Sequence, residues 1–293
     1  MHLLFSAAAA YTMASYEQRI FDVRQFPDHC DHSTLVGAYL ESREATGKTV
    51  VAGSSFAFGY PFASELSFPA YMTEKPINAS VIGIGLSGIT SNTINEIKER
   101  GLRPSRLIVE IPLINEVGAL IRPRTSGKTC SDLGKRSLLR YALASPVSLQ
   151  WYSLLTDPYR GAVASGPISI APVPDDYFAT TDQFEQAKRD LRTNIEAAFA
   201  SASAVADNAF LFVTPVYVPG VDQAGRDGES IRRQFDFAQS ACVEVAGDRC
   251  IMTDHMLDNP AYFTNITHIG PDGAAYLADI IEASVDRAAA LRD

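Results

Sequence analysis

Four short polar or glycine-rich blocks follow apolar runs of the sequence, and their residue types suit acyl-transfer chemistry. Ser55 lies in the first block, Gly53-Ser54-Ser55. A serine on a tight turn from a strand into a helix presents its hydroxyl beside free backbone N–H groups, and an acyl-accepting nucleophile needs both. The simpler interpretation is that these residues only form a turn and cap the next helix.

The second and third blocks offer hydrogen-bond donors for a developing oxyanion. The second block holds Gly83, Gly85 and Gly88, which let the backbone approach a ligand closely, and the Gly85 N–H is a candidate donor. The side-chain amide of Asn115, in the third block, is another candidate, although Asn115 could instead cap the following helix. The literal G-x-G-x-x-G match follows the second strand and lacks an acidic residue about 20 positions on, so we expect no dinucleotide cofactor.

The fourth block, residues 264–273, contains a candidate general base. Pro271 and Asp272 suit the first turn of a closing helix. We therefore expect His268 on the loop directly before that helix, where its imidazole could accept a proton. Of the five histidines, His255 beside Asp254 is the rival candidate.

The spacing of the apolar runs predicts the elements that carry these blocks. Strand-length runs lie at 49–53, 79–84, 106–111, 209–214 and 249–253, and helical patterns at about 34–45, 62–74, 91–101, 134–156, 181–206, 229–246 and 272–291. The runs lack polar alternation, as in parallel strands covered on both faces. This alternation predicts an α/β fold: a three-layer α/β/α, doubly wound, parallel five-stranded sheet. The carboxyl ends of such strands meet at one crevice.

The sequence is organised as one domain with two additions. Residues 1–32 form an N-terminal segment whose apolar part, 3–15, has two open interpretations: a signal or anchor remnant, or an ordinary helix. Residues 33–293 form the single α/β domain, and the strand rhythm is lost from about 118 to 182, which we interpret as an insertion after the third strand.

Composition excludes several classes of function. The chain has 293 residues with 34 acidic and 25 basic side chains, a net charge of -9, and this acidic balance argues against nucleic acid as a partner. Cys30, Cys130, Cys242 and Cys250 lack the paired spacing of a zinc site, so we expect no metal. Cys242 and Cys250 could form a disulfide across a short turn, or all four could be free thiols.

In this order and spacing, the four blocks resemble the SGNH (GDSL-like) family of serine esterases and acyltransferases. The resemblance spans about 50–273. It implies a flavodoxin-like fold, Ser55 as nucleophile, His268 as base, and an oxyanion hole formed by Ser55, Gly85 and Asn115. From the position of the glycine motif and the cysteine spacing, we expect neither a cofactor nor a metal.

Three positions depart from the family pattern. Ser54 stands where the family has Asp, a change also seen in the polysaccharide O-acetylation branch, and Leu113 stands where a Gly is usual. Asn265 stands where Asp-x-x-His needs its acid. An amide oxygen can hold the imidazole tautomer but cannot stabilise the imidazolium electrostatically. Either Ser55, His268 and Asn265 act together, or Asp254 or Asp258 supplies a carboxylate, or the site is degraded.

The resemblance implies a serine-dependent carbohydrate esterase or O-acyltransferase that acts on short acyl esters, with an acylated carbohydrate or acyl donor as partner. It also suggests a membrane-associated polysaccharide machinery and a periplasmic or extracytoplasmic membrane-associated location, with the cytoplasm as alternative. The competing interpretation is a catalytically weakened binding or assembly module of a polysaccharide modification system.

Overall fold

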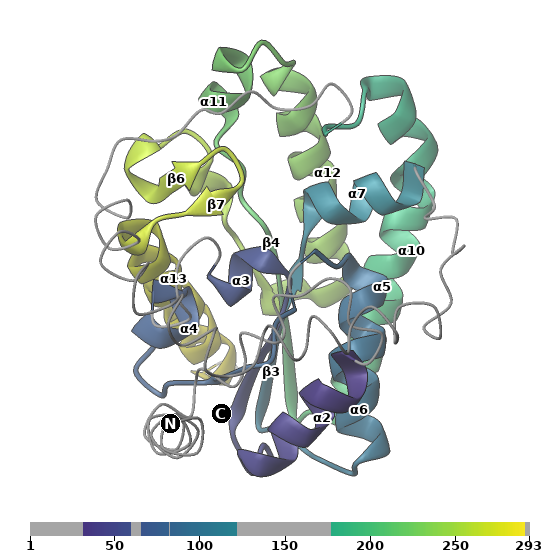
Figure 1. The fold of residues 1–293 in the computed structure, drawn as a ribbon, viewed down its shortest axis with the longest axis vertical. Helices are drawn as coiled ribbons and strands as arrows, with labels where there is room; N and C mark the ends of the chain where they lie inside the picture. Colours follow the sequence, from purple (N-terminus) through teal and green to yellow (C-terminus); the bar gives the residue numbers. More distant parts are fainter. Residues whose placement is uncertain (1–31, 60–65, 82, 122–176, 291–293) are drawn as a thin grey trace, which may run out of the picture.

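The computed structural model describes residues 32–59, 66–81, 83–121 and 177–290, and within them a parallel sheet of five strands forms the centre of the molecule (Figure 1). The strand order is β2-β1-β3-β4-β5. The strands are β1 (Thr49–Ala52), β2 (Ile77–Asn78), β3 (Arg106–Ile111), β4 (Asn208–Val213) and β5 (Cys250–Ile251). This is the flavodoxin-like order of a doubly wound sheet, so the predicted fold class is confirmed.

Helices cover both faces of the sheet, as the apolar strands require. One layer, on the right of Figure 1, comprises α2 (His32–Ser42), α5 (Leu86–Ile89), α6 (Asn95–Glu99), α7 (Leu113–Ile121), α10 (Thr181–Val205) and α12 (Gly228–Ala246). The other layer comprises α3 (Ser55–Phe58), α4 (Phe68–Tyr71) and α13 (Pro271–Ala290). A further short helix, α11 (Val218–Gln223), leads into α12. Each layer packs its own apolar cluster against the sheet.

The two longest helices of the first layer begin at caps that the sequence encodes. Thr180 and Gln183 form a capping box at the start of α10, in which each side chain accepts from the backbone N–H of the other. The Asp227 carboxylate accepts the Ser230 N–H at the start of α12. These caps satisfy N–H groups that a helix terminus otherwise leaves without partners.

Several element boundaries differ from the prediction. The second strand is Ile77–Asn78 rather than 79–84, although the Ala79 and Val81 N–H groups still bond to β1 carbonyls. Gly83, with φ 77°, turns the chain away from the sheet edge. The helix expected at 91–101 begins earlier, with α5, and continues through a π-helical turn, Thr90–Ile94, into α6.

Other predicted elements are shortened or fall outside the described residues. The helix expected at 62–74 is only α4, and 60–65 are outside the described residues. The helix expected at 134–156, the N-terminal segment and most of the 118–182 insertion also lie outside them. Three 3-10 turns, Gly247–Arg249, Asp254–Met256 and Pro260–Tyr262, complete the described connections.

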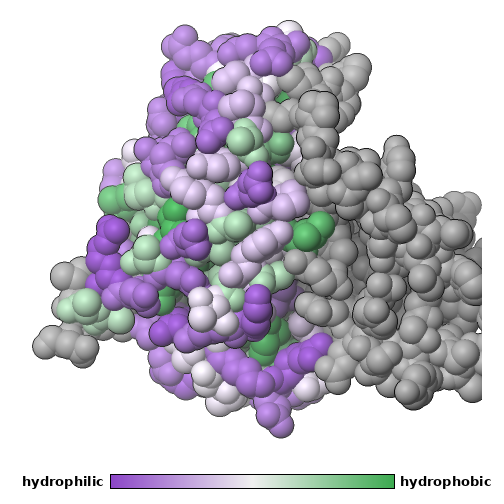
Figure 2. All heavy atoms as spheres, turned by 90° about the vertical axis from the view of Figure 1, so that its left-hand side faces the viewer, coloured by the Kyte–Doolittle hydropathy of each residue, from purple (hydrophilic) through white to green (hydrophobic). Residues whose placement is uncertain are grey.

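The face that carries α13 and α4 is mostly hydrophilic over its described residues, with hydrophobic side chains scattered among polar ones (Figure 2). Large hydrophobic side chains that are exposed include Tyr71, Tyr177, Val243 and Met252. Within the described parts of the chain, no helix is both long and apolar enough to cross a membrane.

A disulfide joins Cys242, near the end of α12, to Cys250 at the start of β5. Their Cα atoms are 5.6 Å apart, within the usual range for a disulfide. The structure therefore favours the bridge over free thiols for this pair, while Cys30 and Cys130 lie outside the described residues.

Removing this disulfide is expected to lower the free energy of unfolding by about 2–3 kcal/mol, because the bridge closes a short loop and restricts the unfolded chain. Urea unfolding of the Cys242→Ala/Cys250→Ala variant measures the effect. Adding reductant to this variant should change nothing further, which controls for Cys30 and Cys130. Unfolding identical to wild type under oxidising conditions would contradict a bridge that contributes to stability.

Candidate active site

The chain turns sharply between β1 and α3, and this turn holds Ser55. Ser54 is the N-cap of α3 in extended conformation, and Ser55 is the first helical residue. The turn requires glycine at position 53, because a Cβ there would lie 2.5 Å from the Cβ of Ala57 and would also collide with Glu110. The predicted strand-turn-helix setting of Ser55 is therefore present at the carboxyl end of β1.

His268 lies in a small antiparallel hairpin rather than on the expected loop. The hairpin pairs β6 (Phe263–Asn265) with β7 (His268–Ile269). The Asn265 side-chain oxygen accepts the backbone N–H groups of Thr267 and His268 at 3.0 and 2.9 Å. This local bonding makes the tight reversal that periodicity alone did not predict. The hairpin leads directly into α13, as expected.

The connection from β4 into α11 supports this hairpin. The Tyr217 N–H donates to the Ile266 carbonyl at 2.9 Å, and the Val218 N–H donates to the Leu257 carbonyl at 3.0 Å. Beneath it lies a separate apolar cluster formed by Phe178, Val216, Val221, Ile231 and Ile266. The tip of the hairpin is therefore held by one backbone hydrogen bond, to Ile266, and by an apolar cluster that includes the Ile266 side chain.

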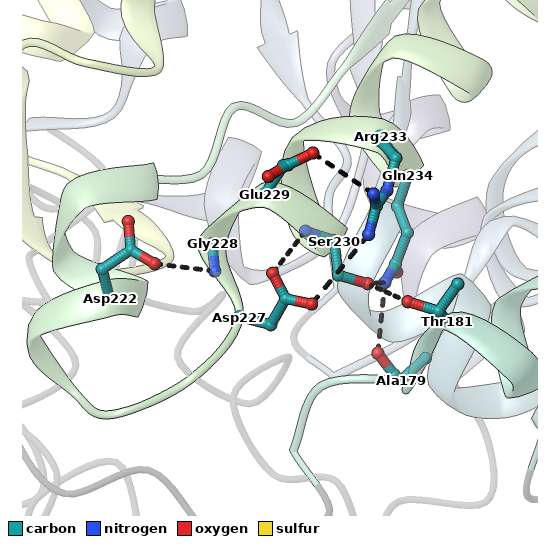
Figure 3. A network of polar contacts seen from close by, with 9 residues as sticks. All are labelled: Ala179, Thr181, Asp222, Asp227, Gly228, Glu229, Ser230, Arg233 and Gln234. Carbon is teal, nitrogen blue, oxygen red and sulfur yellow. Dashed lines mark hydrogen bonds and ion pairs between the residues drawn. The ribbon is translucent and has the colours of Figure 1, made fainter.

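Polar contacts hold the corner between α11 and α12 on which this cluster depends (Figure 3). The Asp222 carboxylate accepts the Gly228 N–H at 2.9 Å. The Ser230 hydroxyl lies 3.1 Å from that of Thr181 at the start of α10. These bonds join α11 to α12, and α12 to the start of α10, beside the hairpin.

Ser55, His268 and Asn265 form a continuous hydrogen-bonded series. The Ser55 Oγ lies 3.1 Å from His268 Nε2. The Asn265 Oδ1 lies 3.1 Å from His268 Nδ1. Because an amide oxygen only accepts, Nδ1 carries the proton in that contact and Nε2 is left to accept from Ser55. The structure thus brings together residues that are 213 positions apart in the chain.

The other described partner of Nδ1 is also neutral. The Thr267 Oγ1 lies 3.1 Å from His268 Nδ1. The two carboxylates considered from the sequence lie elsewhere: Asp258 pairs with Arg232, and Asp254 lies 3.6 Å from Nδ1 of His255. The described contacts therefore favour a Ser-His-Asn set over one completed by either aspartate, and His255 faces Asp254 instead of Ser55.

Burial lowers the pKa of His268 to about 4. Desolvation disfavours the charged imidazolium, and the described Nδ1 partners carry no charge that would oppose this effect. The imidazole is consequently neutral near pH 7, which is the form that can accept a proton.

The pH dependence of hydrolysis follows from this lowered pKa. Protonation of His268 removes the base, so kcat/KM should stay level from about pH 7 down to about pH 5 and fall below about pH 4. An unperturbed histidine would give its acid limb near 6.5 instead. A pH series with a neutral aryl ester distinguishes the two, and an acid limb between about 6 and 7 would contradict a neutral, buried base.

Gly85 and Asn115 lie together at the carboxyl ends of β2 and β3, on either side of β1 in the sheet. Gly85 is the N-cap of α5. Asn115 lies within α7 rather than capping it, and its side-chain amide donates to the Ile84 carbonyl at 3.3 Å. The structure therefore brings the two predicted donors close to each other, at the carboxyl edge of the sheet. Neither residue has a described hydrogen bond to Ser55.

The buried side chain of Glu116 holds the turn that contains Gly85. Its carboxylate is buried and accepts the Leu86 N–H at 2.5 Å and the Asn194 side-chain amide at 2.6 Å. A Cβ on Gly85 would lie 2.5 Å from the same carboxylate. The glycine at 85 is therefore explained by close approach to Glu116.

The sequence analysis gave no role to three groups that contact this site: Glu110, Glu116 and Thr267. Glu110 stands in the apolar run 106–111 and is fully buried. The sequence did contain a signal for Glu110: a charged residue in a strand covered on both faces is rarely buried without hydrogen-bond or ionic partners.

In the described residues, no group of His, Cys, Asp and Glu could hold a metal ion.

No protein-family profile and no curated protein matches the sequence. Among solved structures, the chain is similar to one described as a lipolytic protein of the G-D-S-L family from Desulfitobacterium hafniense DCB-2. The identity is 13%, the TM-score 0.41, and the match covers 82% of this chain and 99% of that one. It is also similar to an extracellular lipase from Streptomyces rimosus, with 9% identity, a TM-score of 0.43, and coverage of 80% and 98%. At these values neither structure bears on activity, which rests on the site itself.

Proposed function

We propose that this protein is a serine-dependent ester hydrolase or O-acyltransferase that forms an acyl-serine intermediate. The single observation that carries the proposal is the series from Ser55 Oγ through His268 to Asn265, with both contacts at 3.1 Å. A hydroxyl bonded to the free nitrogen of a neutral, oriented imidazole is the arrangement that activates a serine nucleophile.

In the first step His268 Nε2 accepts the Ser55 proton while Ser55 Oγ attacks the carbonyl carbon of an ester. The resulting oxyanion would be held by the backbone N–H groups of Ser55 and Gly85 and by the Asn115 amide. One N–H of that amide donates to Ile84; its second N–H has no partner among the described residues, and we assign it to the substrate. The imidazolium then gives its proton to the departing alcohol, and the acyl-serine is left.

In the second step an acceptor hydroxyl gives its proton to His268 and attacks the acyl-serine carbonyl. The intermediate collapses, Ser55 Oγ recovers a proton from the imidazolium, and the acyl group leaves on the acceptor. Water as acceptor makes the protein a hydrolase, and a sugar hydroxyl makes it a transferase. Throughout, Asn265 keeps the proton on Nδ1, so that Nε2 faces Ser55.

We propose acetyl as the acyl group and an acylated carbohydrate or exopolysaccharide as the substrate. The Gly53-Ser54-Ser55 turn supports this proposal, because it resembles the turn of the O-acetylation branch. The location that we propose is extracytoplasmic, in the periplasm or beside a membrane-associated polysaccharide machinery. The Cys242–Cys250 disulfide supports this location, since disulfides persist in oxidising compartments.

A second candidate is a binding or assembly module with a weakened site, and the neutral oxygen of Asn265 is the observation that favours it. Without a carboxylate, the imidazolium that forms during acyl transfer has less electrostatic support. Such a module would bind an acylated glycan without turning it over.

Acetate release separates the two candidates. The enzyme should release acetate from 4-nitrophenyl acetate and from an O-acetylated polysaccharide, and Ser55→Ala should not. Binding of the acetylated polysaccharide without Ser55-dependent acetate release would favour the module. Faster loss of the aryl acetate in the presence of a sugar acceptor, with acetylated sugar as product, would identify a transferase.

A further inference from the structure

A buried carboxylate lies directly beneath the nucleophile turn. Glu110 is the fifth residue of β3 and is 0% exposed. It points to the same side of the sheet as Ile108, which belongs to the apolar cluster of α4 and α13. Its carboxylate meets no described lysine or arginine. Among the described residues, only hydrogen bonds oppose the cost of burying it, and burial still raises the pKa of Glu110 above its ordinary value.

Three of those hydrogen bonds come from the turn that carries Ser55. The Ser54 N–H donates to Glu110 Oε2 at 2.7 Å, and the Ala57 N–H donates to the same oxygen at 3.1 Å. The Ser54 hydroxyl lies 2.5 Å from Oε1. The Thr214 hydroxyl, at the end of β4, reaches Oε1 at 2.9 Å. Glu110 thus connects the residues on both sides of Ser55 to two strands of the sheet.

The geometry of the turn depends on this carboxylate. Ser54 caps α3 without a side-chain cap bond, because its hydroxyl is turned to Glu110 instead. The Gly53 backbone lies so close to Glu110 that a Cβ at position 53 would collide with the carboxylate. If the acceptor is removed, the Ser54 and Ala57 N–H groups are left buried without partners, and the turn must shift to satisfy them.

We propose that Glu110 is a positioning residue of the active site, which holds the turn from Gly53 to Ala57 so that the Ser55 hydroxyl faces His268 Nε2. This inference rests on the proposed function. It also explains why Ser54 fits at its position: an aspartate there would bring a second carboxylate against Glu110, whereas a hydroxyl donates to it.

Substitutions at Glu110 test the inference directly. Glu110→Leu removes both acceptor oxygens, and a displaced nucleophile should lower kcat about 30-fold or more while KM changes by less than about threefold. Glu110→Gln keeps one oxygen for the two N–H groups and turns its amide to the Ser54 and Thr214 hydroxyls, which can accept. We expect it to retain kcat within about fivefold of wild type.

A second pair of variants keeps the test decisive if Glu110→Leu does not fold. Ser54→Asp should lower kcat about 30-fold or more when assayed at about pH 9, where both carboxyl groups are ionised and repel each other. The assay needs this pH because burial raises the pKa of Glu110, and at lower pH the two groups can share a proton. Adding Glu110→Gln to Ser54→Asp should recover at least about tenfold of that loss. The matched control is Gln239→Leu, which removes a buried polar group that bonds to β5 and not to the turn, and its kcat should stay within about twofold of wild type.

Amide hydrogen exchange of residues 53–58 reports on the turn without any activity. Exchange in this segment should rise in Glu110→Leu and not in Gln239→Leu. An inactive wild type with this exchange pattern would refute the proposed function and leave the role of Glu110 in the turn intact. An active wild type whose kcat is unchanged in folded Glu110→Leu, or a Ser54→Asp loss that Glu110→Gln does not relieve, would overturn the inference.

Discussion

Ser55→Ala is expected to lower kcat for 4-nitrophenyl acetate by about 10⁴-fold or more, because no acyl-enzyme can form without the hydroxyl. The residual rate would come from binding and from the oxyanion donors alone. The change removes one hydrogen bond, to His268 Nε2. Stability measured by urea unfolding should therefore shift by no more than about 1 kcal/mol.

The matched control is Ser42→Ala. The Ser42 hydroxyl bonds to the Tyr39 carbonyl at the end of α2, away from the carboxyl edge of the sheet, and this variant should keep its full kcat. A Ser55→Ala variant that retains more than about a tenth of the wild-type kcat would rule Ser55 out as the nucleophile.

Two substitutions of Asn265 should move activity in opposite directions. Asn265→Leu removes the acceptor for Nδ1 and for two backbone N–H groups of the hairpin, so the imidazole loses its orientation and kcat should fall about 10³-fold. Asn265→Asp keeps the acceptor oxygen and adds a charge that stabilises the imidazolium. It should raise kcat about 10²-fold, less than the roughly 10⁴-fold that an amide costs in a serine triad when it imposes the wrong tautomer, because the Asn265 oxygen already holds the correct one.

The pH profile gives Asn265→Asp an independent readout. A carboxylate beside Nδ1 favours the protonated imidazole and raises the pKa of His268 from about 4 toward its ordinary value. The acid limb of kcat/KM should move upward with it. Asn259→Asp is the control, because Asn259 makes a similar local turn by accepting the Ala261 N–H but does not contact His268. Equal kcat and equal acid limbs in Asn265→Asp and wild type would contradict a catalytic role for the Asn265–His268 contact.

The fold could be predicted from the sequence because its central strands are long, apolar runs covered on both faces. The limits of β3 match the run 106–111, and those of α10 and α12 lie within a residue or so of the predicted helices. The edge strand β2 begins two residues before the predicted run, and the Ala79 and Val81 N–H groups continue its pairing with β1 into that run. The hairpin β6–β7 was missed because its reversal depends on one asparagine side chain and not on an apolar pattern.

The candidate site was only partly predictable, for a related reason. Ser55 and His268 stand at positions that strand ends and helix starts mark in the sequence, and the structure brings their side chains within hydrogen-bond distance. The contacts of Glu110 with Ser54 and of Glu116 with Leu86 join segments 56 and 30 residues apart. Such contacts depend on how the loops that contain Ser54 and Leu86 pack against β3 and α7. The local periodicity of the sequence does not encode this packing.

Labelling with a serine-directed sulfonyl fluoride or fluorophosphonate, read by intact mass and peptide mapping, tests the central claim most directly. An activated Ser55 should take up one adduct per chain, Ser55→Ala should take up none, and His268→Ala should react far more slowly. A wild-type chain that stays unmodified, or that carries its adduct on a residue other than Ser55, would contradict the claim that Ser55 and His268 form a nucleophile and its base.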